Sequence, residues 1–205
     1  MEKNMENITA EQLKLRLRSL TILDMALTSD EWLRLMSAGR EGDLIWHIFD
    51  NGGGDRMWIY IKGSSIVIKG FDHESELNQL AAAIPNFGFF EKTFRGMPSV
   101  LIRLFEQDEL DETTFCLWTT DGGETWVENP AENTDGGKDW LMGYLTDDAE
   151  EFCQWAKDYY GKDLPFEITK KLVSDGKLSN DELKALGASD EALQEIEEYE
   201  KIWAL

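Results

Sequence analysis

Residues 44–49 (LIWHIF), 57–61 (MWIYI) and 66–68 (IVI) are three apolar runs rich in β-branched and aromatic side chains. Residues 50–55 (DNGGGD) separate the first two runs, and Gly63, Ser64 and Ser65 separate the last two. Runs of this composition between glycine-rich turns are typical of antiparallel strands. The sequence therefore predicts a three-stranded meander that ends at residues 70–75 (GFDHES).

A second hairpin is predicted further along the chain. Residues 115–120 and 125–127 flank the sequence DGGE at 121–124. A two-residue turn at 122–123 places Trp118 opposite Val127 and Thr119 opposite Trp126. We expect this hairpin to join the same antiparallel sheet.

Helices are predicted before and after these strands along the sequence. Thr9 with Gln12, and Thr28 with Glu31, have capping-box spacing, which predicts a helix from about residue 10 to the mid-20s and a short one ending near residue 39. Apolar spacing favours further helices over 77–84 and 89–94, and residues 100–105 fit either a helix or a strand. From residue 136 onward the pattern predicts helices only, with Thr146 as the cap of the longest one.

The predicted fold class is α+β, with an antiparallel sheet built from hairpins, helices packed on it and a C-terminal helical appendage. Ser179 with Glu182 forms a capping box in that appendage, and glycines 176 and 187 act as helix stops. We expect an α+β domain over 1–162 and a small helical appendage over 163–205. A chain ending near Lys162 is expected to fold by itself.

Composition bounds the class of protein. The 205 residues are 42% hydrophobic, which is enough for a sizeable core and excludes disorder as a description of the whole chain. The net charge is −21, and residues 106–163 carry 17 acids against 3 bases. A field of this sign repels phosphate backbones and anionic lipid and attracts basic proteins. The composition therefore favours a basic protein partner and argues against nucleic acid and membrane surfaces.

Cytoplasmic localisation is expected. Cys116 and Cys153 lie in a predicted strand and a predicted helix without C-x-x-C spacing, which fits free thiols in a reducing compartment. No window reaches the 18 apolar residues that a membrane span needs, and the first residues are polar where a secretory peptide has an apolar core.

His73 is the candidate catalytic residue, with Asp72 and Glu74 beside it in the GFDHES segment. A neighbouring carboxylate stabilises an imidazolium and orients the ring as a general base. Side chains alternate along an extended segment, so Asp72 and Glu74 share a side from which His73 points away. Ser75 lacks the context of a nucleophile, and a structural role for His73 in hydrogen bonding the loop stays open.

A metal site is not predicted, and no cofactor is expected. His47, His73, Asp72 and Glu74 can be assembled on paper, but no close pair of His or Cys ligands occurs. Residues 50–55 have the oxygens and glycines of a calcium loop, yet Lys62 stands where an EF-hand loop has its acidic residue. This loop is interpreted as a tight turn.

Protein binding is the function that the sequence favours, of an immunity or regulatory type. Candidate binding residues are two aromatic anchors and three acids, namely Trp126, Trp140, Asp147, Asp148 and Glu150. The alternative is a small hydrolase or a metal-assisted enzyme that uses His73 with Asp72 or Glu74. The oligomeric state is left open.

The chain resembles an uncharacterised family of bacterial proteins with a G-F-D-H-E-S signature. The resemblance covers about residues 50–160 and rests on residues 51–55 (NGGGD), residues 70–75, Trp118, Trp126 and residues 139–141 and 155–160. It departs from that pattern at residues 77–79, and it implies no activity. The acidic composition and the Asn-Gly-Gly sequence also resemble SMI1/KNR4-type immunity proteins, although the Leu-Pro-x-x-Tyr opening of those proteins is missing.

Overall fold

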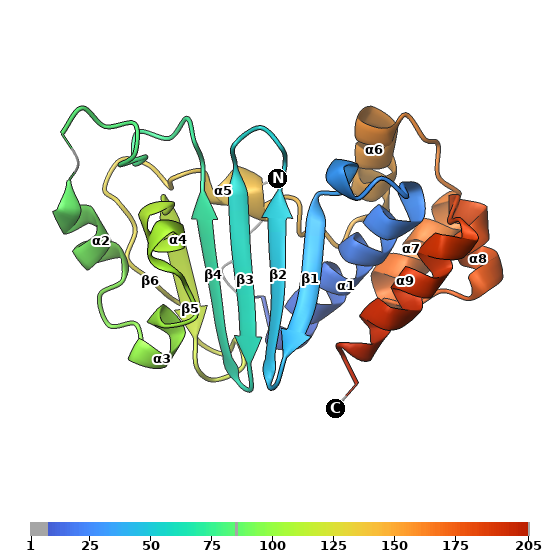
Figure 1. The fold of residues 1–205 in the computed structure, drawn as a ribbon, viewed down its shortest axis with the longest axis horizontal. Coiled ribbons are helices and arrows are strands. Elements are labelled where there is room, and N and C mark those ends of the chain that lie inside the picture. Colours follow the sequence, from blue (N-terminus) through green and yellow to red (C-terminus); the bar gives the residue numbers. More distant parts are fainter. Residues whose placement is uncertain (1–7, 85, 205) are drawn as a thin grey trace. The chain divides into compact units, whose positions relative to one another are not determined.

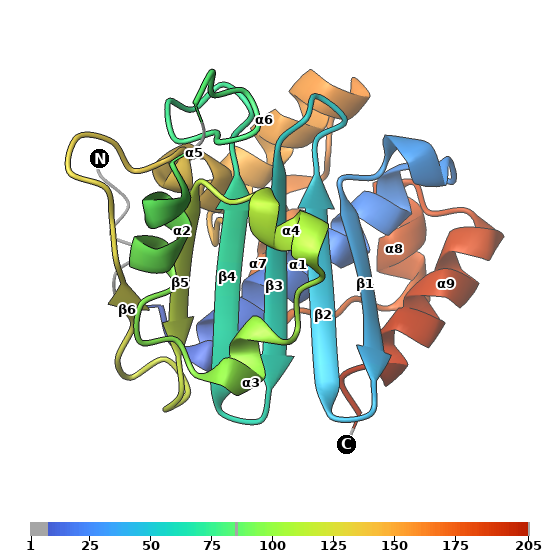
Figure 2. The ribbon, with the colours of Figure 1, turned by 60° about the vertical axis from the view of Figure 1, so that its left-hand side comes forward.

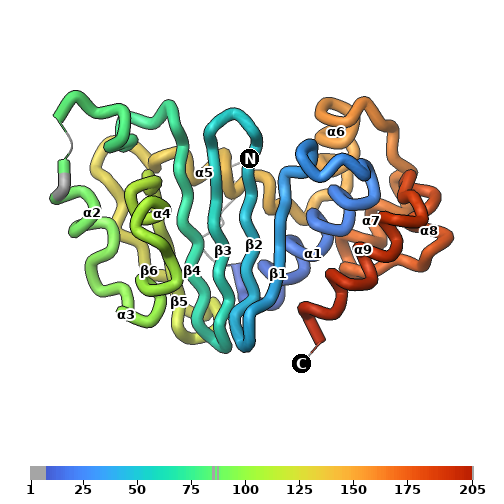
Figure 3. The backbone as a smooth tube through the Cα atoms, viewed as in Figure 1, coloured from blue at the N-terminus to red at the C-terminus, as the bar shows by residue number. Residues whose placement is uncertain are grey.

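The computed structural model describes residues 8–84 and 86–204 (Figures 1 and 3). The chain divides into two compact units. The first contains the described residues up to Ala10 together with Arg40–Tyr144, and the second contains Glu11–Gly39 together with the described residues from Leu145 onward.

A six-stranded antiparallel sheet confirms the α+β class (Figure 2). The strands follow one another in chain order: β1 (Met36–Glu41), β2 (Leu44–Asp50), β3 (Arg56–Lys62), β4 (Ser65–Phe71), β5 (Phe115–Thr119) and β6 (Val127–Glu128). The predicted meander is β2–β3–β4, and the predicted second hairpin joins it through pairing of β4 with β5. Trp118 pairs with Val127, as the two-residue turn predicted.

Helices of the first unit cover one face of this sheet. They are α2 (Phe87–Thr93), α3 (Ser99–Ile102) and α4 (Gln107–Asp111), and Figure 2 shows α3 and α4 in front of the strands. The core on this face is a cluster of buried side chains from three strands and the helical segment, namely Trp58, Tyr60, Val67, Phe71, Met97, Leu101, Phe105, Cys116 and Trp118. Apolar burial of this kind is the main favourable term in folding.

The opposite face of the central strands is buried as well. Met57, Ile59, Ile66 and Ile68 have no exposed surface. The helix α5 (Lys138–Met142) lies on this side in Figures 1 and 2. Strands buried on both faces consist of continuous apolar runs, which explains why β3 and β4 were recognisable in the sequence.

Lys69 is a buried lysine of β4, and its side chain lies on the same face of the sheet as the core cluster. Its Nζ lies 3.4 Å from the centroid of the Trp58 ring and donates a hydrogen bond to the carbonyl oxygen of Glu112. Lys69 is fully buried, and burial lowers its pKa to about 7. The cation–π contact and the carbonyl therefore offset only part of the cost of removing the ammonium from water.

The second unit is mainly helical, and it also includes residues 36–39 of β1. Its elements are α1 (Ala10–Leu27, whose first residue belongs to the first unit), the 3-10 helix η2 (Glu31–Leu33), α6 (Ala149–Tyr160), α7 (Phe166–Asp175), α8 (Asn180–Leu186) and α9 (Asp190–Lys201). The predicted capping box of Ser179 and Glu182 is present, and Gly176 and Gly187 end their helices in the left-handed conformation that glycine adopts without a Cβ penalty.

Three predictions of local structure were wrong. The short helix expected up to residue 39 is the 3-10 turn η2 followed by strand β1. Residues 77–84 form turns, because the Asn78 side chain accepts hydrogen bonds from the N–H groups of Leu80 and Ala81. Helix α6 begins at Ala149 with Asp148 as its N-cap, two residues after the predicted cap.

The tail helices contact α1 within the second unit. Ser19 donates a hydrogen bond to the carbonyl oxygen of Leu172, and Arg18 pairs with Glu200. Outside α1, Arg34 at the end of η2 pairs with Glu195. The boundary at residue 162 stays a prediction.

A chain ending at Lys162 tests that boundary. We now expect it to lose its cooperative thermal transition in the helical unit, because buried tail side chains such as Leu172 and Ile196 each contribute about 1.5–3 kcal/mol and a domain has only about 5–15 kcal/mol in total. Circular dichroism against temperature measures this. A truncated chain that unfolds as cooperatively as the full chain would support the boundary predicted from the sequence.

The variant Lys69→Met tests the buried ammonium. A folded-state pKa of about 7 lies below the unfolded value of about 10.4, so the unfolded chain binds more protons between these pH values and wild-type stability rises with pH there. Relative to the variant, the wild type should gain about 2 kcal/mol of unfolding free energy between pH 7 and pH 9. Guanidinium unfolding at both pH values measures the unfolding free energies of the two proteins. If they differ by the same amount at pH 7 and pH 9, the lowered pKa of Lys69 is contradicted.

Candidate functional site

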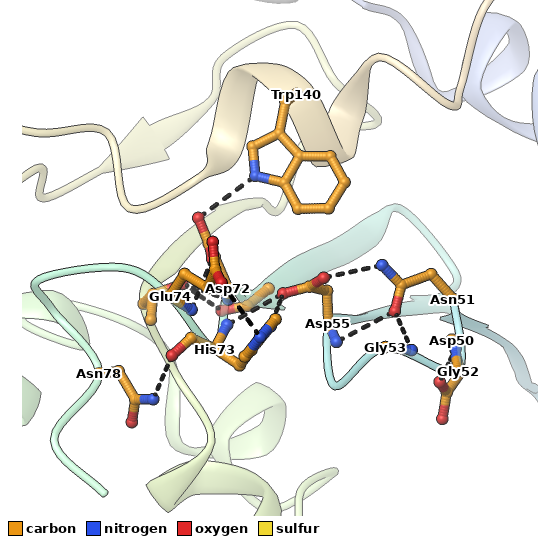
Figure 4. Close-up of polar contacts among 12 residues, drawn as sticks. Asp50, Asn51, Gly52, Gly53, Asp55, Asp72, His73, Glu74, Asn78 and Trp140 are labelled. Carbon is orange, nitrogen blue, oxygen red and sulfur yellow. Dashed lines mark hydrogen bonds and ion pairs between the residues drawn. The ribbon is translucent and has the colours of Figure 1, made fainter. Parts of the chain in front are cut away.

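The site residues come from two loops that follow paired strand ends. Strands β3 and β4 pair in a register that joins Arg56 to Phe71. Asp55 precedes the first of these residues and Asp72 follows the second, so the register brings the two carboxylates to the same end of the hairpin. Figure 4 shows the loop before β3 and the loop after β4 side by side.

Asn51 shapes the loop between β2 and β3. Its Oδ1 accepts hydrogen bonds from the N–H groups of Gly53 (2.8 Å) and Asp55 (3.2 Å), and its Nδ2 donates to Asp55 Oδ2 (2.7 Å). Gly54 has a φ of +106°, and a Cβ there would lie 3.3 Å from the His73 ring. The glycine therefore provides both the backbone conformation and the room that His73 needs.

Asp55 holds His73 by two hydrogen bonds. Its Oδ1 accepts the backbone N–H of His73 at 3.0 Å, and Nδ1 of the ring lies 2.8 Å from the same oxygen. The Asp55 side chain is 7% exposed and the His73 side chain is 43% exposed. A buried carboxylate thus orients a half-exposed imidazole (Figure 4).

These contacts shift both pKa values. The hydrogen bond to Asp55, followed by the carboxylate charges of Asp55, Glu74 and Asp72, raises the pKa of His73. Burial acts to raise the pKa of Asp55, but the hydrogen bonds from His73 and Asn51 outweigh it and hold that pKa below its usual range. The charged pair is therefore the favoured form at mildly acidic pH.

Asp72 is held by contacts of its own. Its Oδ1 accepts the N–H of Glu74 at 3.0 Å, and its Oδ2 accepts Nε1–H of Trp140 at 3.3 Å. A Cβ on Gly137 would lie 2.5 Å from Asp72 Oδ2, so only glycine allows this approach. Glu74 Oε1 is 3.9 Å from His73 Nε2, which is beyond hydrogen-bonding distance.

The arrangement has two chemical capacities. With Nδ1 held by Asp55, His73 Nε2 is the ring nitrogen left to accept a proton, which is the geometry of a histidine general base. Asp55, Asp72 and His73 also offer one potential metal-ligating atom each within 4.8 Å of one another. A structural role is served by the same contacts, since Asn78 Nδ2 also donates to the His73 carbonyl at 2.7 Å.

Asp55 is the orienting carboxylate that sequence reasoning missed. Asp72 and Glu74 were assigned that role, and the structure instead places Asp55 on Nδ1. The signal was present, because a two-residue turn at Gly63 and Ser64 fixes the β3–β4 register and puts Asp55 opposite Asp72. His47, included in the metal set assembled on paper, is fully buried in β2, where burial lowers its pKa to about 3.

The predicted binding residues are divided between the two units. Trp126 Nε1 donates to the Ile8 carbonyl at 2.8 Å, which gives this side chain a structural contact, and Trp140 is 42% exposed. In the second unit, Arg16 pairs with Asp147, and Asp148 caps α6 by accepting the N–H of the exposed Glu150. A binding role for this set stays a prediction.

Comparison of the chain with protein-family models, with curated proteins and with solved structures gave no match. In the part of the chain that the structure describes, every helix is too short or too polar to cross a bilayer. The function is therefore inferred from the geometry and charge of the described residues.

The variant Asp55→Asn tests the histidine contact. It should bring the pKa of His73 down toward its ordinary value, because the hydrogen bond to the Asp55 carboxylate is the largest cause of the increase. Stability that arises from a raised histidine pKa is present below the unfolded value of about 6.5 and is lost as the pH rises through the folded value. The variant should therefore lose more stability at pH 6 than at pH 9.

An NMR pH titration of the imidazole protons measures the pKa directly. The protein has two histidines, and the low pKa of His47 removes it from the neutral range. An unchanged His73 pKa in Asp55→Asn would contradict the assigned contact.

Proposed function

We propose that this protein is an acidic cytoplasmic binding factor, of an immunity or regulatory type, that engages a basic protein. The observation that supports the proposal best is a partly open apolar strip on the sheet of the first unit, bordered by the acidic helix α4. The strip consists of Leu44, Trp46 and Ile48 of β2.

The strip is an apolar surface on one face of β2. Residues two apart along a strand point to the same face, so the three side chains are aligned. They are half-buried and pack against the core cluster, where Trp46 pairs with Tyr60 of β3 and Ile48 pairs with Trp58. An aromatic and two aliphatic side chains on a rigid strand are suitable anchors for a partner.

Helix α4 supplies negative charge next to this strip. Glu109 hydrogen bonds to Tyr60, the strand neighbour of Trp46. Burial, followed by the charge and the hydrogen bond of Glu109, raises the pKa of Tyr60. Glu106 and Asp108 are exposed, and Asp111 is half-buried. An apolar centre with an acidic border fits a partner that carries an apolar anchor among lysines or arginines.

The same charge argues against other partner classes. Phosphate backbones and anionic lipid headgroups are repelled by a chain with a net charge of −21. Cys116 and Cys153 are free thiols, which agrees with the cytoplasmic localisation inferred from the sequence.

A small hydrolase or metal-assisted enzyme is the second candidate, and the Asp55–His73 pair is the observation that favours it. This activity would require His73 and would be indifferent to α4. Binding of a basic partner has the opposite dependence, so His73→Gln and variants of α4 separate the two candidates.

The binding proposal is tested with the triple variant Glu106→Gln, Asp108→Asn and Asp111→Asn, in which the amides retain hydrogen-bond acceptors. Basic proteins captured by the full chain from a lysate should decrease several-fold with this variant and also with Trp46→Ala, because the steering charge and the anchor are removed separately. Quantitative mass spectrometry of the captured proteins at low and high salt measures the decrease.

Two matched variants serve as controls. Asp181→Asn with Glu191→Gln and Glu197→Gln removes the same charge from exposed positions of the second unit, and Trp32→Ala removes an 81% exposed tryptophan there. These controls should capture the same proteins as the wild type. If no basic protein distinguishes the α4 and Trp46 variants from their controls, the proposal fails.

A further inference from the structure

Asp55, Asp72 and His73 form a compact group of metal-ligating side chains. The atoms they offer lie within 4.8 Å of one another, and all three residues belong to the first unit. Two carboxylates and one imidazole give a charge of −2 when the ring is neutral, so a divalent cation would neutralise the group. The group shares no residue with the α4 surface proposed for protein binding.

The spacing of these atoms suits a metal with short bonds. Metal–ligand bonds of about 2.0–2.2 Å place neighbouring ligand atoms about 3–3.5 Å apart. Asp55 Oδ1 and His73 Nδ1 are 2.8 Å apart as a hydrogen-bonded pair, slightly closer than that value, and a cation would bind between them by displacing the shared proton. No two of these atoms are more than 4.8 Å apart. To reach ligand spacing, the widest pair has to approach by about 1 Å, and the half-exposed side chains of Asp72 and His73 have room to move by that amount.

The surrounding residues hold the ligands in place. Asn51 Nδ2 donates to Asp55 Oδ2, and Trp140 Nε1 donates to Asp72 Oδ2, so one oxygen of each carboxylate is already oriented (Figure 4). Such outer contacts orient metal ligands and increase affinity. Gly137 leaves the space beside Asp72 that a Cβ would fill at 2.5 Å.

The donor set indicates the class of metal. Imidazole nitrogen with carboxylate oxygen favours Zn²⁺ and other divalent transition metals, whereas Ca²⁺ and Mg²⁺ take oxygen ligands. We propose that Asp55, Asp72 and His73 bind one divalent transition-metal cation of the Zn²⁺ class. Three protein ligands leave the remaining coordination position open to water or to a group from another molecule.

The site is tested with the full chain, which is first treated with a chelator to remove bound metal. Zinc is then titrated into the protein, and calorimetry measures the binding. All proteins carry Cys153→Ser, because Cys153 is a partly exposed thiol that can bind zinc by itself. The background protein should bind one equivalent of Zn²⁺ at micromolar concentration. Asp72→Asn and His73→Gln should each reduce the affinity at least about tenfold, as loss of a ligand does more than loss of an outer contact.

Asp43→Asn is the matched control. It removes one acidic charge from a largely exposed side chain that pairs with Lys62, outside the metal-ligating group of the same unit. It should bind zinc as the background protein does. Circular dichroism of each variant confirms that it is folded.

A spectroscopic measurement keeps the test independent of stability. Addition of Co²⁺ should broaden the imidazole resonances of His73 and leave those of the buried His47 sharp, since paramagnetic broadening falls steeply with distance. Absence of stoichiometric binding, equal affinity in the ligand and control variants, or tighter binding of Ca²⁺ or Mg²⁺ than of Zn²⁺ would each overturn the proposal. None of these outcomes bears on protein binding through α4.

Discussion

The register of β3 against β4 is the constraint on which the rest of the first unit depends. Both strands are buried on both faces, so a slip of one residue would turn the side chains of Trp58 and Tyr60 away from the core cluster. The two-residue turn after Lys62 sets this register, and Arg56 paired with Phe71 is its last step. The loops beyond that pair must therefore lie next to each other, and the candidate site consists of residues from these two loops.

Burial of Asp55 is the energetic cost of this site, and hydrogen bonds offset it. A carboxylate removed from water has a raised pKa unless donors stabilise its charged form. Here the backbone and ring of His73 and the side chain of Asn51 supply those donors, and the net pKa of Asp55 is lowered. Lys69 shows the opposite balance, because one carbonyl and the face of Trp58 leave its pKa at about 7. Lys69 is the more deeply buried of the two groups and also has fewer oriented partners.

Most of the sheet could be predicted from the sequence, but little of the site could. Continuous β-branched and aromatic runs predicted β2, β3 and β4, and the Gly122–Gly123 turn predicted the pairing of Trp118 with Val127, because these signals are local. Strand β1 was missed because residues 36–41 (MSAGRE) have no strand pattern of their own and gain this state by pairing with β2. The GFDHES segment drew attention to His73, but its partner Asp55 lies 18 positions earlier and becomes visible only when the hairpin register is counted.

Arg56 connects the two proposed functions, and its exposure indicates how strongly they can be coupled. It pairs with Glu112, which follows α4, at 3.3 Å and with Asp50, the last residue of β2, at 2.8 Å. Its side chain is 44% exposed, and exposed ion pairs contribute about 0–1 kcal/mol. Because about 1.4 kcal/mol corresponds to a factor of ten in affinity, coupling through Arg56 alone stays below tenfold. A cation at Asp55 and a basic partner at α4 would therefore bind nearly independently, and strong linkage between them would require the partner itself to contact His73 or Asp72.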